Sequence, residues 1–248
     1  MDRTAYDRYF ALEERHFWRV ARRKLVLELL EQHRPGPGPL RILDVGGACS
    51  LIPREMQRFG PVTVIEPDAA TVEFSRRELG LDVRCGGLPD KLPVEGPFDV
   101  ITMLDVLEHI DDDAGALRAI RPLLRPGGLL LLTVPALPVL WSSHDVSVHH
   151  KRRYLRPGFR SLIEDNGFVV NRLSYHTSLL LPVLAPQRIA DRWKGIDPHA
   201  EYNVKPPPAP VNRAFAAVMS VEASLFRRMD LPIGSSLVAV ATPGPVGS

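Results

Sequence analysis

The feature that most constrains the fold is a regular alternation of apolar runs and helix-like stretches between residues 40 and 134. The apolar runs predict strands at residues 40–45, 61–65, 81–83, 98–104 and 129–134. Stretches of helical character separate most of them, at residues 51–59, 69–79 and 111–124. Because strands that alternate with helices form parallel sheets covered on both faces, this pattern predicts an α/β protein with right-handed crossovers.

Further elements lie on both sides of this alternation. Apolar residues at helical spacing fill the first thirty residues, and a proline- and glycine-rich run ends that helix at residues 35–39. A helix is predicted at residues 156–166, and strands at residues 168–174 and 236–242. About sixty residues separate these two strands, and they contain helical stretches at residues 179–193 and 214–229. The sequence thus predicts one domain spanning residues 1–248, with an N-terminal helical cap (1–34), a core (40–174), a helical insertion (178–232) and a last strand (236–242).

Composition excludes several other classes of protein. With 45% hydrophobic and 24% charged residues among 248, the chain can build a core, which argues against disorder and against collagen-like chains. A net charge of +2 provides no general attraction for nucleic acid. Two cysteines, Cys49 and Cys85, cannot form a disulfide framework or a four-ligand zinc site. The polar N-terminus and the lack of an apolar run of about eighteen residues predict a cytoplasmic protein without a transmembrane segment.

Acidic motifs stand at the ends of the first two predicted strands. Asp44 precedes Gly46 and Gly47, and small residues after a strand let the chain turn tightly beside a nucleotide-like ligand. Glu66 ends the second strand, where a carboxylate can accept hydrogen bonds from both hydroxyls of a ribose. Each motif alone is also typical of a turn or a helix N-cap. Together, in this order and at this spacing, they indicate an adenosyl ligand.

A nicotinamide dinucleotide is the alternative ligand for such a pattern. Dehydrogenases need glycines spaced G-x-G-x-x-G, whereas residues 46–51 are Gly-Gly-Ala-Cys-Ser-Leu. Hydride transfer is therefore disfavoured.

Three later motifs complete an ordered series: Gly86-Gly87-Leu88 after the third strand, Asp105-Val106-Leu107-Glu108-His109 after the fourth, and Arg125-Pro126-Gly127-Gly128 before the fifth. The series resembles the class I S-adenosylmethionine-dependent methyltransferases, whose seven-stranded Rossmann-like, doubly wound sheet is mostly parallel with an antiparallel last strand. The resemblance covers residues 40–174 and 236–242. It is strongest to the small-molecule branch that includes ubiquinone-pathway and sugar methyltransferases. Residues 16–23 and 149–154 look like bacterial members linked to polysaccharide or lipid pathways.

The resemblance implies S-adenosylmethionine as the cofactor and S-adenosylhomocysteine as its product. It assigns Asp44, Gly46, Gly47, Leu104 and Asp105 to the methionine part, Glu66 to the ribose, and Gly87 and Leu88 to the adenine. The resemblance also implies that the N-terminal helix lies over the cofactor. Trp18 and Arg22 are four residues apart and share one face of this helix. Packing and surface ion pairs are the alternative for that helix.

The sequence departs from the family's pattern at three positions. Ala48 and Ser50 replace glycines of the turn, and Gly87 stands where many members have a polar residue beside the adenine. A catalytically silent S-adenosylmethionine-binding or interaction protein is therefore the alternative hypothesis.

Methyl transfer to an alcohol needs a base, and histidine titrates in the useful range. His109 is the leading candidate because it follows the fourth strand at the sheet edge where the sulfonium is expected. A histidine that bonds the backbone is the alternative. A second group follows the fifth strand and consists of His144, Asp145, His149 and His150, which could supply a base or a metal site. For His144 and His149 we favour a role in acceptor binding, together with Trp141. The irregular spacing of this group argues against a metal, and none is predicted.

A basic cluster lies in the same region and consists of Lys151, Arg152, Arg153, Arg156 and Arg160. It is either a solvated face or a site for a phosphate or carboxylate on the acceptor, or for an acidic carrier protein. The cluster is too short, and too poor in interleaved aromatic residues, to indicate nucleic acid.

The insertion is the segment that we expect to select the acceptor. Its apolar run at residues 179–184 and its helical stripe at residues 215–229 fit a packed layer or a dimer contact. They also fit a lid over a lipid-linked acceptor, or a peripheral contact with a membrane surface. We expect O-methylation of a small-molecule, sugar or lipid-linked acceptor. The sequence leaves N- or C-methylation, and the oligomeric state, open.

Overall fold

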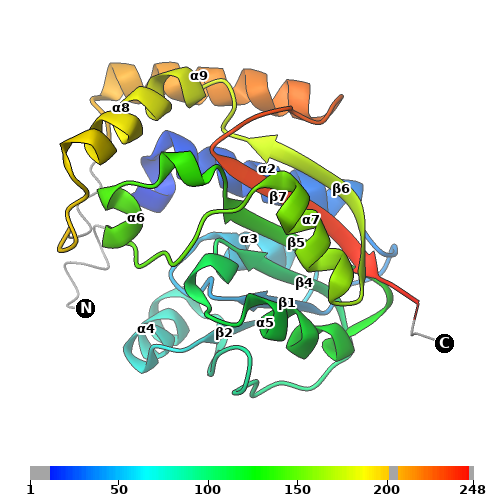
Figure 1. Cartoon of the computed structure of the whole chain (residues 1–248). Helices are drawn as coiled ribbons and strands as arrows, with labels where there is room; N and C mark the ends of the chain where they lie inside the picture. The colour runs from blue at the N-terminus through cyan, green and yellow to red at the C-terminus, as the bar shows by residue number, and fades with distance from the viewer. Residues whose placement is uncertain (1–11, 201–205, 246–248) are drawn as a thin grey trace.

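The predicted strands form one sheet in the computed structural model, which describes residues 12–200 and 206–245. The strand order is β3-β2-β1-β4-β5-β7-β6 (Figure 1). The strands are β1 Ile42–Val45, β2 Val62–Glu66, β3 Asp82–Cys85, β4 Phe98–Leu104, β5 Leu124–Pro135, β6 Phe168–His176 and β7 Ser236–Pro243. Strands β1 to β5 pair in parallel, whereas β7 is antiparallel to both of its neighbours. The predicted fold class is confirmed.

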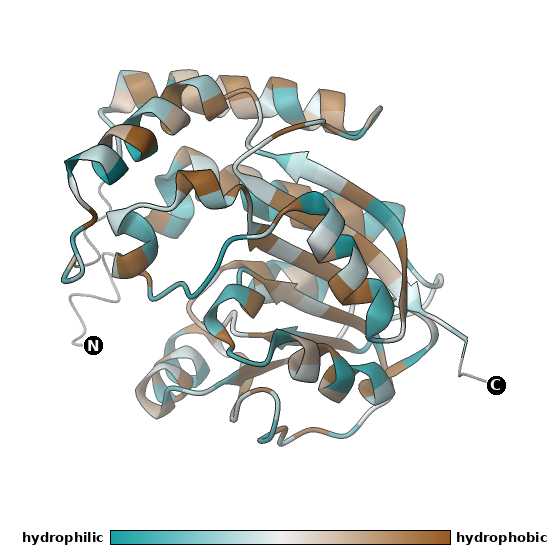
Figure 2. Ribbon diagram, in the orientation of Figure 1, coloured by the Kyte–Doolittle hydropathy of each residue, from teal (hydrophilic) through white to brown (hydrophobic). Residues whose placement is uncertain are grey.

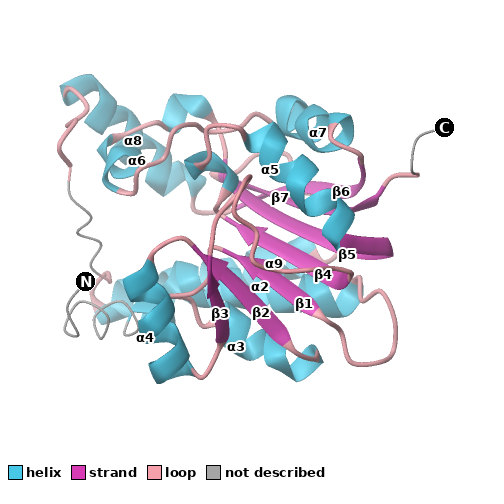
Figure 3. Ribbon diagram, turned by 90° about the horizontal axis from the view of Figure 1, so that it is seen from below, coloured by secondary structure: helices cyan, strands magenta, loops and turns pink. Residues whose placement is uncertain are grey.

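Helices cover both faces of the sheet, and most of the strand residues are therefore buried. Helices α5 (Asp113–Ile120) and α7 (Arg156–Asp165) lie on one face (Figure 1). Helices α2 (Phe17–Gln32) and α3 (Ile52–Met56) lie on the other, and the view from below separates the two layers (Figure 3). Helix α4 (Ala69–Leu79) packs beside β3. The main hydrophobic core lies between these layers, and the central strands are its most apolar part (Figure 2).

The bounds of α4 follow from local signals and match the prediction. The side chain of Asp68 accepts a hydrogen bond from the backbone N–H of Thr71 at 2.9 Å and so caps the N-terminus. The helix ends at Gly80, whose φ of 63° is a left-handed conformation that favours glycine.

The N-terminal helix and β5 differ from their predictions. Residues 12–15 are helical, but α2 begins only at Phe17, because His16 caps it by accepting a hydrogen bond from the backbone of Trp18. The predicted apolar positions Tyr6, Tyr9 and Phe10 lie outside the described residues. Strand β5 begins five residues earlier than predicted, so the glycine turn at residues 125–128 lies within its irregular start, where pairing with β4 shifts register.

The insertion contains the two predicted helices, α8 (Leu181–Lys194) and α9 (Ala209–Phe226). Helix α9 packs along α2, and α9 lies at the top of the view in Figure 1. A small apolar cluster of Phe17, Leu180 and Met219 joins the insertion to the N-terminal helix. Helix α9 is therefore packed against the rest of the chain, whereas α8 has no buried residue, and the role of the insertion stays a prediction. None of the described helices is long and apolar enough to cross a membrane.

Short helical turns complete the fold. Helix α6 (Ser143–Ser147) lies in the polar stretch for which no helix is predicted, and a capping box of Ser142 and Asp145 forms its start. Four 3-10 turns occupy η1 Gln57–Phe59, η2 Leu107–His109, η3 Arg121–Leu123 and η4 Pro138–Leu140.

Candidate active site

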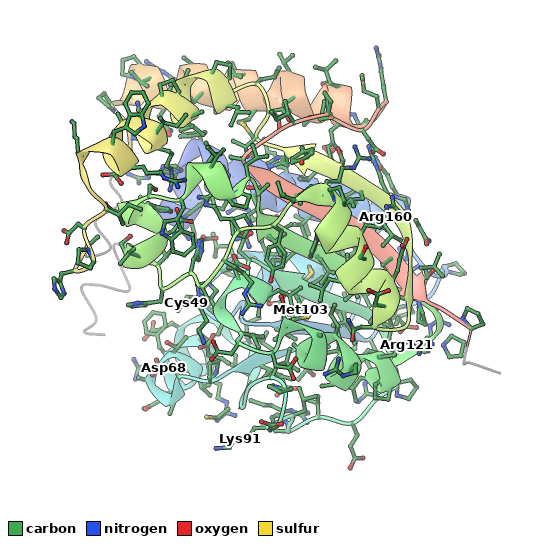
Figure 4. The ribbon with its side chains drawn as sticks, viewed as in Figure 1. Cys49, Asp68, Lys91, Met103, Arg121 and Arg160 are labelled. Carbon is green, nitrogen blue, oxygen red and sulfur yellow. The ribbon has the colours of Figure 1, made fainter. Side chains whose placement is uncertain are left out.

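A cavity of about 470 Å³ opens at the carboxyl ends of β1 and β4. The strand order changes direction between these two strands, and open α/β sheets bind ligands at this point. In Figure 4, Cys49 marks this edge of the sheet and Met103 lies within β4. Nine of the residues predicted for the site line the cavity: Trp18, Arg22, Asp44, Gly46, Gly47, Glu66, Leu104, Asp105 and His144.

Asp44 is a buried acid at the end of β1. Thr102 on β4 donates a hydrogen bond to its Oδ1, whereas its Oδ2 has no partner among the described residues. Burial raises the pKa of Asp44 to about 7, although the hydrogen bond from Thr102 and the charge of Arg22 oppose the shift. A Cβ on Gly47 would lie 1.8 Å from Asp44 Oδ2, so only glycine fits at this position beside the carboxylate.

Asp105 follows β4 with a φ of 53°, a conformation that is uncommon outside glycine. The Thr133 hydroxyl donates to its Oδ1 at 3.1 Å, and Arg22 Nη2 lies 2.8 Å from its Oδ2. The same guanidinium donates to the Leu104 carbonyl at 2.6 Å and stacks on the Trp18 ring. These contacts hold α2 over the sheet edge, as the predicted helical cap requires.

Glu66, at the end of β2, lines the cavity, but the predicted adenine-binding residues do not. Burial raises the pKa of Glu66, whose Oε1 accepts a hydrogen bond from the Asp68 backbone at 3.3 Å. Gly87 bonds Lys91 across the loop after β3, and Leu88 packs against the core. Neither belongs to the cavity lining, so their assignment to the adenine stays a prediction.

The structure separates the three predicted catalytic histidines. His144, on α6, lines the cavity, and burial together with the charge of Arg188 lowers its pKa to about 4. His109 and His149 lie outside the lining, and His109 Nδ1 is 3.2 Å from the His149 carbonyl. This position matches the alternative for His109, a histidine that bonds the backbone.

His150, not singled out as a base from the sequence, does line the cavity. Its Nδ1 is 2.9 Å from Asp145 Oδ1. Burial disfavours the Asp145 carboxylate, but hydrogen bonds and charges from His150 and Arg153 hold its pKa well below the usual range. The sequence signal is the group of histidines and an aspartate at residues 144–150, but spacing alone cannot show which of them face inward.

Glu108 is completely buried beside His150. Neither carboxylate oxygen has a hydrogen-bond partner among the described residues, and burial and the charge of Asp105 raise its pKa well above the usual range. His150 Nε2 is 3.6 Å from Glu108 Oε1, beyond hydrogen-bond reach. Glu108, His109 and His150 each bring a potential metal-ligating atom within 4.8 Å of one another. The expectation that no metal binds stays a prediction.

Of the basic cluster, only Arg153 lines the cavity. Other members pair with surface acids: Lys151 with Asp111, Arg152 with Asp113, and Arg160 with Glu164. For these residues the structure matches the solvated-face interpretation.

Comparison with known proteins assigns the family. Residues 12–176 match the model of a methyltransferase domain. The chain belongs to this methyltransferase family. Membership confirms the resemblance to class I S-adenosylmethionine-dependent methyltransferases and, with it, the predicted cofactor.

Individual relatives agree with this family. A ubiquinone biosynthesis O-methyltransferase of Methylocella silvestris is 36% identical over 137 residues, which are 52% of this chain and 50% of the relative. The chain thus spans about half the length of the curated relatives it matches.

Solved structures share the fold. The methyltransferase in complex with the Trm112 activator of Haloferax volcanii has a TM-score of 0.62 at 16% identity, over 99% of this chain and 96% of that one. A TehB-like S-adenosylmethionine-dependent methyltransferase of Corynebacterium glutamicum has a TM-score of 0.53 at 16% identity, over 90% and 87%.

Proposed function

We propose that this protein transfers a methyl group from S-adenosylmethionine to a hydroxyl group of a small-molecule acceptor. The observation that carries the proposal is the combination of two groups in one cavity. The first group is the acids Asp44 and Glu66, which line the cavity and suit the methyl donor. The second is His150, which also lines the cavity and is oriented by Asp145.

The donor end of the cavity fits S-adenosylmethionine. The unpartnered buried oxygen of Asp44 suits an ammonium group, and Gly47 leaves room beside it. Glu66 would hold the ribose hydroxyls, and Trp18 and Arg22 would close this end from α2. When bound, the cofactor supplies a methyl group that its sulfonium already activates.

The base in this proposal is His150. The bond between its Nδ1 and Asp145 fixes the ring, and Nε2, which lies 3.6 Å from Glu108 Oε1, would take the proton of an acceptor hydroxyl. Arg153 in turn holds Asp145 with Nε at 2.8 Å from Oδ1 and Nη2 at 3.2 Å from Oδ2. His144, whose lowered pKa keeps it neutral, would contact the acceptor.

The acceptor end combines apolar and polar side chains. Leu140, Val148 and Leu184 line the cavity near α6 and α8, which favours an acceptor with an apolar or aromatic body. The printed name of the relatives, ubiquinone biosynthesis O-methyltransferase, supports O-methylation of a small molecule. The same proposal includes a sugar- or lipid-linked acceptor, a peripheral contact between the insertion and a membrane, and a cytoplasmic location.

Two measurements test the proposal. Isothermal titration should show that S-adenosylhomocysteine binds and that NAD does not, and Glu66→Gln should weaken binding about tenfold through the lost charged hydrogen bonds. An acceptor screen with labelled S-adenosylmethionine should then find phenols or alcohols methylated at oxygen. Binding without turnover on any acceptor would favour the silent alternative, and no binding at all would reject the proposal.

A further inference from the structure

The cavity wall built by α6, α8 and the segment after α6 carries an excess of positive charge. Arg153 and Arg188 both line it, and Asp145 is the one acid that both contact. Asp145 itself does not line the cavity, and the acids that do, Asp44, Glu66, Asp105 and Glu108, belong to β1, β2 and the segment after β4.

Asp145 neutralises Arg153. The Arg153 side chain is 4% exposed, and its Nε and Nη2 pair with the two carboxylate oxygens of Asp145. Its Nη1 donates to the Ala136 carbonyl at 2.8 Å. All three guanidinium nitrogens are therefore engaged, and Arg153 has a structural role.

Arg188, on α8, is only partly satisfied. Its Nη1 donates to Ser142 Oγ at 2.7 Å and reaches Asp145 Oδ2 only at 3.4 Å, while Nε and Nη2 have no hydrogen bond to the described residues. Asp191, one turn later, instead accepts a hydrogen bond from the Ser143 backbone at 2.7 Å. Arg188 thus presents free donors to the cavity.

The surroundings of Arg188 make its charge costly. Burial, and then the charge of Arg153, lower the pKa of Arg188 to about 10, which leaves it charged at neutral pH. His144 beside it stays neutral, so the histidine adds no second charge. A partly desolvated cation with free donors gains from an anion that reaches it.

We propose that Arg188 is the specificity-determining residue that binds an anionic group, a carboxylate or a phosphate, on the methyl acceptor. The inference rests on the proposed function and names the class of acceptor: molecules with an apolar body that bear a negative charge at the α8 end. The insertion then selects the acceptor through a charged hydrogen bond as well as through its apolar side chains.

The test uses protein saturated with S-adenosylhomocysteine and three probes of similar shape: benzoate, phenyl phosphate and the neutral benzamide. We expect the protein to bind one or both anions at least tenfold more tightly than benzamide. Arg188→Gln should reduce the affinity for the preferred anion by about tenfold to a hundredfold and leave benzamide unchanged. Arg192→Gln, an exposed arginine one turn later on α8, is the matched control and should change nothing. The two anions distinguish a carboxylate site from a phosphate site.

Three results would overturn the inference. The first is equal affinity for anions and benzamide, or no measurable binding of any probe. The second is an anion preference that survives Arg188→Gln. The third is a loss of S-adenosylhomocysteine affinity in R188Q as large as the loss of anion affinity, which would assign Arg188 to the carboxylate of the cofactor. Failure of S-adenosylhomocysteine to bind the parent protein would instead reject the proposed function, so the two failures are distinguishable.

Discussion

Replacing Asp44 with asparagine is expected to remove a pH-dependent loss of stability from the ligand-free protein. The Asp44 side chain is 1% exposed, and burial raises its pKa to about 7 from an ordinary value of 3.8. Asparagine has nearly the same shape and can accept the hydrogen bond from Thr102 through its carbonyl oxygen. It does not ionise, so the substitution isolates the charge.

The direction of the effect follows from the raised pKa. Below about pH 3 the folded and unfolded chains both hold the proton, and the carboxyl contributes no pH dependence. As the pH rises toward 7, the unfolded chain releases its proton first. The free energy of unfolding therefore falls, by on the order of 4 kcal/mol, and levels off above pH 7. The stability of D44N relative to the parent should rise by that amount between pH 4 and pH 8.

Urea unfolding followed by tryptophan fluorescence at several pH values measures this difference. Asp165→Asn, which replaces an exposed acid on α7, is the matched control for the loss of one carboxylate charge. Saturation with S-adenosylhomocysteine should remove most of the pH dependence of the parent, because an ammonium group beside Asp44 favours the carboxylate. A D44N difference that stays constant within about 0.5 kcal/mol from pH 5 to pH 8 would refute the reasoning.

Three further substitutions test other parts of the structure. His150→Ala should lower kcat at least a hundredfold and leave S-adenosylhomocysteine affinity unchanged; an unchanged kcat would remove His150 as the base. Gly47→Ala would place a Cβ 1.8 Å from a buried carboxylate oxygen, so it should lower the free energy of unfolding in urea by about 2–4 kcal/mol and weaken cofactor binding. Gly158→Ala is the control, because no atom lies within 4 Å of its Cβ, and it should not lower the free energy of unfolding. Glu222, a buried acid on α9, accepts hydrogen bonds from the backbone N–H groups of Thr177, Ser178 and Leu179, so Glu222→Ala leaves them without their acceptor and should cost about 3–5 kcal/mol. The exposed Ser220→Ala should cost less than about 0.5 kcal/mol, and similar values for both would contradict a stabilising role of these hydrogen bonds.

The sheet and the donor end of the site could be predicted because their signals are local. Strand β4 and helix α4 have the predicted bounds, since burial on both faces and the caps at Asp68 and Gly80 leave a mark in the sequence. Asp44 and Glu66 end their strands, and strand ends meet at one edge of a parallel sheet. Position along the chain was therefore enough to bring them into one cavity.

The proposed base, His150, could not be predicted in this way. The 3-10 turn η2 buries Glu108 and leaves the next residue, His109, partly exposed and outside the cavity lining, and a shift of one residue in such a turn has no sequence signature. Helix α6 has no apolar periodicity. Its polar start, in which Asp145 pairs with the buried Arg153, depends on partners that only the folded chain brings together.

The cavity therefore has two ends with different origins. The donor end is built entirely from motifs within the family-matched residues 12–176, whereas the acceptor end combines residues of that segment, such as Leu140 and Val148, with side chains of α8, which begins after the match ends. The insertion supplies Leu184 and Arg188 to the acceptor end, so acceptor choice can change there without any change in the acids that serve the donor. Removal of the whole insertion would not show this, because α9 packs along α2 and α2 carries Arg22 to Asp105. Point substitutions on the cavity face of α8 are the changes that separate acceptor selection from cofactor binding.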